Sequence, residues 1–237
     1  MNKDLIEVIK LYSTASHKEL NNFLLDKSKD NLIAILNDLL TIYINDKNSS
    51  TIREFITTTI SGYIHNENKI GYNGFRQITL NSENINEYCE VKPKNIITNT
   101  NDLNNVNKKS KNKLNAGGNF TDYTWERFDR DLNAKLNMLI SGFVDGKLIY
   151  ILEFPFSNQS FINKLQLQLN KKFPNRQRNK NDYLRSANFD FKDFMFNENN
   201  EKNNNFKINF LLTKQELENY KNYFNKKFFD ELLKYAK

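Results

Sequence analysis

The chain has 237 residues, 38% of them hydrophobic and 13% aromatic, which favours a single globular domain over a disordered chain. Its one cysteine, Cys89, excludes an intramolecular disulfide, and two histidines are too few for a Cys/His zinc site. The formal net charge of +7 suits a polyanionic partner such as nucleic acid, although lysines that simply solvate the surface would give the same value.

The N-terminal part is predicted to be helical and the next part to contain strands. Apolar side chains recur at helical spacing within residues 1–64, where glycine and proline are almost absent. The stretches GYNGFRQITL (71–80) and EYCEVKPKNI (87–96) are typical of strands, and Asn73-Gly74 is a turn signal at the entrance of the first. The polar, lysine-rich stretch 98–119 is then expected to be a long loop.

Helices and strands are expected to alternate in the remainder of the chain. Residues 121–136 predict a short helix capped by Thr121 or Asp122, and Asp145-Gly146 predicts a hairpin between the apolar runs of 137–156. The later predictions are a helix ended by Pro174, a basic loop over 174–182, strands over 186–196 and 206–213, and one long helix over 214–236. The fold expected is one α/β domain, a mixed central β-sheet flanked by helices, with a helical region (1–64), a core (65–156) and a C-terminal region (157–237).

Glu90 and Lys92 interrupt the second predicted strand. Residues two apart in a strand point to the same face, so the carboxylate and the ammonium project together, beside Tyr88. A carboxylate can hold Mg²⁺ and a lysine can orient an attacking water, whereas the simpler interpretation is an ion pair on a solvated sheet face. The (Asp/Glu)-x-Lys triplet alone is a weak signal, because it also begins at Glu67, Asp145 and Asp190.

The order of elements, with GYNGF followed by a strand that carries CEVKPKN, resembles the core of the PD-(D/E)xK nucleases over roughly residues 50–156. The similarity is greatest to type II restriction endonucleases. It implies that Glu90 and the Val91 carbonyl bind Mg²⁺ and that Lys92 positions the attacking water. It also implies double-stranded DNA as the substrate and a homodimer as the functional form.

Asn73 stands where that family has an aspartate ligand. It is a natural, weaker ligand, or another residue supplies the carboxylate, or the chain is inactive; as part of an Asn-Gly pair it also has a purely structural explanation. Glu54 lies opposite the apolar face of its predicted helix and is expected to face solvent, whereas Glu67 and Glu153 are further possible donors. Asn73 remains the first choice, which makes Asn73, Glu90 and Lys92 the predicted catalytic residues.

Three basic segments are candidates for DNA contact, because Lys and Arg bind phosphates and Arg, Asn and Gln read base edges. They are KPKN, NKKSKNKLNAGGNF and NRQRNK. The predicted DNA-binding residues are Lys94, Asn95, Lys109, Lys111, Lys113, Asn119, Arg176 and Arg178. Each of these segments has the alternative interpretation of a solvated basic loop.

The function expected is therefore that of a Mg²⁺-dependent, sequence-specific DNA endonuclease of the restriction type. Two alternatives stay open: a DNA-binding protein whose nuclease site is impaired at Asn73, and a protein whose terminal helices bind a partner. The sequence lacks an apolar run of about 18 residues and a signal-peptide apolar region, so we expect a cytoplasmic protein that does not enter the membrane.

Overall fold

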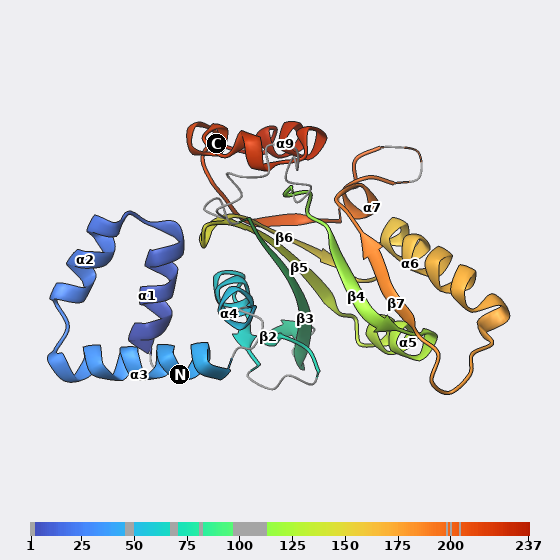
Figure 1. Cartoon of the computed structure of the whole chain (residues 1–237), viewed down its shortest axis with the longest axis horizontal. Coiled ribbons are helices and arrows are strands. Elements are labelled where there is room, and N and C mark those ends of the chain that lie inside the picture. The colour runs from blue at the N-terminus through green and yellow to red at the C-terminus, as the bar shows by residue number, and fades with distance from the viewer. Residues whose placement is uncertain are drawn as a thin grey trace, which may run out of the picture.

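The computed structural model describes residues 3–45, 50–66, 71–80, 83–96, 113–197, 199, 201–203 and 205–237. It is an α/β fold built on a mixed sheet flanked by helices, as predicted (Figure 1). The helices are α1 (Lys3–Thr14), α2 (His17–Leu25), α3 (Lys29–Asn45), α4 (Thr51–Ile60), α5 (Trp125–Asn133), α6 (Gln159–Lys172), α7 (Lys192–Met195), α8 (Lys214–Glu218) and α9 (Lys226–Leu233). Among the described helices, none is long and apolar enough to cross a lipid bilayer.

A six-stranded sheet forms the centre of the molecule, in the order β1-β2-β3-β5-β6-β8. Its strands are β1 (Ile64–His65), β2 (Gly74–Leu80), β3 (Glu83–Ile96), β5 (Asn137–Val144), β6 (Lys147–Pro155) and β8 (Lys207–Leu211). β3 and β5 are parallel and the other neighbours are antiparallel. β5 and β6 are almost continuously buried because elements cover both faces of the sheet, which explains their apolar runs.

The predicted hairpin between β5 and β6 is confirmed. Asp145 and Gly146 connect the two strands and have φ values of 47° and 79°. Positive φ at both central residues is the requirement of the tight turn that Asp-Gly favours, since glycine has no Cβ to clash there.

One face of the sheet is covered by the N-terminal helices, which were predicted correctly. Leu5, Ile9, Phe55 and Ile56 are buried, in one cluster with apolar side chains of β5 and β6. α4 packs against the sheet itself, whereas α2 and α3 lie farther out (Figure 1). The outer sides of α2 and α3 leave Leu25, Ile33, Leu36 and Leu40 largely exposed.

The other face carries a second, two-stranded sheet of β4 (Gly118–Tyr123) and β7 (Leu184–Phe189), which we call the ribbon. Phe120 and Phe189 of the ribbon enter the largest core cluster with Phe154 of β6 and Phe161 of α6. Figure 1 shows the ribbon between the central sheet and α6. Aromatic packing therefore fixes the position of the ribbon relative to β3.

Two predictions around the ribbon were partly wrong. β4 begins at Gly118, inside the predicted loop, so α5 starts later than expected and its cap is Thr124, whose hydroxyl accepts the Arg127 N–H. The stretch 186–196 is a strand only to Phe189 and then turns into α7. There Asp193 accepts the Asp190 N–H and caps the turn, a local preference of Asp that competes with strand pairing.

The predicted C-terminal helix is divided into α8, a 3₁₀ turn (Lys221–Tyr223) and α9. Leu114 explains the break, because its N–H donates to the Tyr223 carbonyl and its carbonyl accepts the Asn225 N–H. Asn225 then caps α9 by accepting the Phe228 N–H. The pairing with a residue more than a hundred positions away overrides the helical pattern.

Replacing Gly142 with alanine is expected to destabilise the sheet by about 1–3 kcal/mol. A Cβ at this buried position would lie 2.3 Å from Cε1 of Tyr150, a fully buried side chain whose hydroxyl accepts the Ala116 N–H. Urea unfolding measures the loss. In a Tyr150→Leu background, which removes the ring, the same substitution should cost less; an equal cost in both backgrounds would argue against the clash.

Candidate active site

Glu90 and Lys92 project from the same face of β3, as predicted. Lys92 Nζ lies 2.5 Å from Glu90 Oε1, and the two side chains are only 20% and 12% exposed. Lys92 also lies over the Phe120 ring, at 4.8 Å from its centroid, and its Cβ would be 3.0 Å from a Cβ at Gly118. The pair is thus enclosed by the ribbon, unlike an ion pair on a solvated sheet face.

α5 adds further charge to the surroundings of Glu90. Arg127 Nη2 lies 3.9 Å from Glu90 Oε1, and Arg127 Nε lies 3.8 Å from the buried carboxylate of Asp131. Asp131 accepts two hydrogen bonds from Arg130. Burial raises the pKa of Asp131, and the negative charge of Glu90 contributes to this shift, although the two arginines oppose it. Arg127 is therefore a cation of the site that the sequence analysis did not identify.

One edge of β3 loses its strand partner beside Glu90. The register of β2 and β3 ends at Gly74 and Cys89, and Asn73 occupies the next place. The Asn73 N–H donates to the Cys89 carbonyl at 2.9 Å, and its Oδ1 accepts the Val91 N–H at 2.8 Å, so its side chain continues the ladder. Because the N–H and C=O of one strand residue point to the same side, the Val91 carbonyl also faces this edge.

The Asn73-Gly74 pair is not a turn with positive φ, contrary to the turn signal, since neither residue is among those of positive φ in the described chain. Gly74 has a different requirement: a Cβ there would lie 2.8 Å from the Ile64 carbonyl oxygen of the neighbouring strand. The pair therefore serves a close approach of β1 and β2.

Glu54 belongs to this site, and the expectation that it faces solvent was wrong. It is partly buried, and its Oε2 accepts a hydrogen bond of 3.0 Å from Asn73 Nδ2. The polar side of α4 faces the free edge of β3, which the helical pattern of α4 alone does not reveal. Asn73 thus connects Glu54 to the β3 backbone one residue from Glu90. Glu67, another possible donor, lies outside the described residues.

Glu153 lies on the opposite face of the sheet and belongs to a separate network. Its side chain is 3% exposed and forms ion pairs with Arg76 at 3.0 Å and with Lys207 at 2.9 Å. It also accepts hydrogen bonds from the Tyr63 hydroxyl and from Asn209 Nδ2. Glu87 pairs with Arg76 on this same face, because it lies an odd number of residues from Glu90 along β3. Both carboxylates are thereby removed from the Glu90 site.

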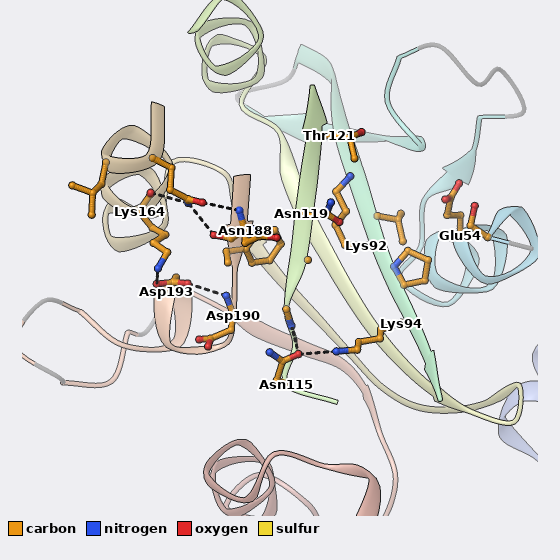
Figure 2. A pocket seen from close by; sticks show the side chains of 18 residues that line it. Glu54, Lys92, Lys94, Asn115, Asn119, Thr121, Lys164, Asn188, Asp190 and Asp193 are labelled. Carbon is orange, nitrogen blue, oxygen red and sulfur yellow. Dashed lines mark hydrogen bonds and ion pairs between the residues drawn. The ribbon is translucent and has the colours of Figure 1, made fainter. Parts of the chain in front are cut away.

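A cleft of about 940 Å³ separates the free edge of β3 from the ribbon. Lys92, Lys94 and Lys164 line it together with Glu54 and several amide side chains (Figure 2). Lys94 Nζ donates to the Lys113 carbonyl at 2.7 Å and to Asn115 Oδ1 at 3.2 Å, and burial lowers the pKa of Lys94. The lining of the cleft is mainly polar, and Asp190 and Asp193 stand in it beside the lysines.

The predicted DNA-binding residues divide between the cleft and other places. Lys94 and Asn119 line the cleft. Asn95 instead accepts the Gly146 N–H at 3.2 Å, at the end of the β5–β6 hairpin. Lys113 is exposed next to Lys94, which contacts its carbonyl, whereas Lys109 and Lys111 lie outside the described residues.

Arg176 and Arg178 are not brought to the cleft. Arg176 pairs with Asp129 at 2.9 Å and stacks over the Trp125 ring, and Arg178 pairs with Glu126 at 3.3 Å. Both side chains bind α5 and hold the basic loop against it. Their charge was visible in the sequence, but their acidic partners were not.

Oxygen donors collect at the free edge of β3: the carboxylates of Glu54 and Glu90, the Val91 carbonyl and Asn73 Oδ1. Within the described ranges, no three His, Cys, Asp or Glu side chains gather into a metal-binding group. Mg²⁺ is commonly held by one or two carboxylates, with water and substrate phosphates completing its shell. Glu54 and Val91 line the cleft and Glu90 precedes Val91 on β3, so two carboxylates and a carbonyl at this edge fit Mg²⁺.

Comparison with known proteins does not relate this chain to a known family. No family model, curated protein or solved structure matches the chain significantly. The assignment of a function rests on the residues and their arrangement.

Proposed function

We propose that the chain is a Mg²⁺-dependent endonuclease that hydrolyses phosphodiester bonds of double-stranded DNA at specific sequences. The observation that carries the proposal is the Glu90–Lys92 pair next to the free edge of β3, with Lys92 on a cleft that Lys94 and Lys164 also line. The resemblance to PD-(D/E)xK nucleases is consistent with this arrangement, since the pair follows a short antiparallel strand and precedes a parallel one.

Each residue has a distinct part in the proposal. Glu90, Glu54 and the Val91 carbonyl would hold Mg²⁺, with Asn73 Oδ1 as a neutral additional donor. Bound Mg²⁺ would lower the pKa of the attacking water and offset the charge that develops on the phosphate. Lys92 would orient that water through its ammonium group. Lys94 and Lys164, which also line the cleft, would bind neighbouring phosphates, Lys164 by exchanging its 3.8 Å pair with Asp193 for a phosphate.

A plasmid-nicking assay in Mg²⁺ or EDTA tests the proposal. We expect Mg²⁺-dependent cleavage of supercoiled DNA at a defined site, and a homodimer if the site is palindromic. Absence of cleavage in every divalent metal, with the chain folded and DNA bound, would leave only a binding function. Absence of DNA binding at low salt would exclude both DNA-related functions.

Replacing Asn73 with aspartate tests whether residue 73 lies at a metal position. The new carboxylate would replace the 3.0 Å hydrogen bond to Glu54 by repulsion between two anions. Without Mg²⁺ we expect a loss of about 1–3 kcal/mol in the free energy of unfolding. Mg²⁺ should restore it, because a ligand that binds the folded state stabilises that state. Cleavage should be preserved or increased.

Thermal unfolding in EDTA and in Mg²⁺ measures this effect. Asn222→Asp, the same charge change at an exposed position of the 3₁₀ turn before α9, is the control. If Mg²⁺ raises the Tm of both variants equally, residue 73 does not contribute to a metal site.

Two observations favour the other candidate functions. The Asn73 amide stands where the resembled family has a carboxylate and uses Nδ2 toward Glu54, as expected for a DNA-binding protein without cleavage. The exposed Leu25, Ile33, Leu36 and Leu40 of α2 and α3 are the feature that a partner-binding protein would use. Sedimentation of the purified chain shows whether that surface associates.

A further inference from the structure

The outer face of the ribbon carries a cluster of uncharged polar side chains at one end, whereas the exposed Asp122 and Arg185 lie toward the other end of its two strands. Phe120, Ala187 and Phe189 point inward and are buried, whereas Asn119, Thr121, Ser186 and Asn188 alternate with them on the outer side. A surface of amides and hydroxyls lacks the positive charge that attracts phosphates from a distance, and it offers directional hydrogen bonds.

A chain of hydrogen bonds orients these side chains. Asn119 Nδ2 donates to Ser186 Oγ at 3.2 Å, and Ser186 Oγ donates to Asn188 Oδ1 at 3.0 Å. Within the part of the chain that the structure describes, this leaves Asn119 Oδ1 as an acceptor and Asn188 Nδ2 as a donor, together with the second N–H of Asn119 Nδ2. Asn119 and Asn188 are direct partners in the ribbon's register, so the acceptor and the donor come from adjacent positions.

Gln168 of α6 makes the ribbon rigid at this point. Its Oε1 accepts the Asn188 N–H and its Nε2 donates to the Asn188 carbonyl, both at 2.9 Å. The outer edge of β7 is thus paired with a side chain of a helix. Side chains that are already fixed lose less conformational entropy when a ligand binds. Selective hydrogen bonding benefits from such a rigid surface.

The ribbon and Lys92 of the Glu90–Lys92 pair line one cleft. Asn119, Thr121 and Asn188 line it on one side and Lys92 and Lys94 on the other (Figure 2). A duplex whose backbone lies against the lysines would present its bases to the ribbon. A two-stranded β-ribbon also has dimensions that the major groove of B-DNA admits.

We propose that the outer face of the β4–β7 ribbon reads base edges in the major groove and selects an adenine–thymine pair. Adenine presents the N6 donor and the N7 acceptor, the complement of Asn119 Oδ1 and Asn188 Nδ2. Guanine presents two acceptors and no donor there, so Asn119 Oδ1 would be left without a partner. This inference rests on the proposed function in one respect: it takes double-stranded DNA as the ligand. It does not require that the chain cleaves that DNA.

The test compares the sequence preference of variants on a library of random duplexes, read by sequencing both the bound and the cleaved fragments. We expect the wild-type chain to select a motif with at least one fixed A·T pair. Asn188→Asp keeps the side-chain shape but removes the donor, and Asn119→Ala removes the acceptor. Each should lower the preference at that pair by roughly 10-fold or more, the size of one good base contact. Asn222→Ala is the control and should select the wild-type motif.

The outcomes separate the two proposals. Cleavage with the same motif in wild type and both ribbon variants overturns the ribbon assignment and supports the nuclease. Selective binding without cleavage, lost in Asn188→Asp, supports the ribbon assignment and contradicts the nuclease. A motif without a fixed A·T pair, or an equal loss of binding to all sequences in folded variants, overturns readout by this face.

Discussion

Lys92→Ala is expected to reduce the rate of Mg²⁺-dependent DNA cleavage by about 10²–10⁴-fold. The substitution removes the ammonium that lies 2.5 Å from Glu90 and leaves the lysine-lined remainder of the cleft in place. DNA affinity should therefore change far less than cleavage. Single-turnover cleavage of a plasmid, together with a binding titration in Ca²⁺ or EDTA, measures both quantities.

Lys192→Ala is the matched control, because it makes the same lysine-to-alanine substitution elsewhere in the chain. Lys192 also belongs to an Asp-x-Lys triplet, but it lies exposed on α7, and only its backbone N–H contacts Asp190. This variant should cleave as the wild type does. If Lys92→Ala retains full activity, or if both lysine variants lose activity equally, the assignment of Lys92 to the reaction is wrong.

Glu153→Ala is expected to cause the largest loss of stability, about 3–5 kcal/mol. The buried carboxylate accepts hydrogen bonds from Tyr63 and Asn209 and pairs with Arg76 and Lys207. Its removal leaves the Tyr63 hydroxyl and the Asn209 amide without their acceptor, and Arg76 keeps Glu87 as its carboxylate partner. Urea unfolding followed by circular dichroism measures the change.

Glu153→Gln should lose less than the alanine variant, because the amide keeps the volume and one acceptor oxygen. Glu87→Gln, which weakens only the more exposed partner of Arg76, should cost least of the three. Equal losses for Glu153→Gln and Glu87→Gln would show that the network is not centred on Glu153.

Local patterns in the sequence were sufficient for much of the fold. Helical periodicity located the N-terminal helices, and Asp145-Gly146 located the central hairpin, because both depend on neighbours in the chain. The C-terminal helix was overextended because its interruption depends on Leu114, far away in sequence. Non-local pairing of this kind leaves no mark on the periodicity of the segment that it interrupts.

The candidate site was recovered in part for a similar reason. The two-residue period of a strand placed Glu90 and Lys92 together without any knowledge of the sheet. Glu54 and Arg127 were missed because only the packing of α4 and α5 on the sheet shows which sides of these helices face β3. Arg176 and Arg178 were predicted to bind DNA because the sequence shows their charge. It does not show that acidic residues of α5 pair with both side chains.

The contact of Gly118 with Lys92 has a consequence for protein engineering. The first residue of the ribbon lies so close to the lysine that any side chain there would press on both Lys92 and Phe189. Ribbons transplanted from other proteins, or libraries randomised across residues 118–123, would have to keep glycine at the first position. Residues 119 and 121 face outward and are open to variation, so a new binding preference is best sought at those positions.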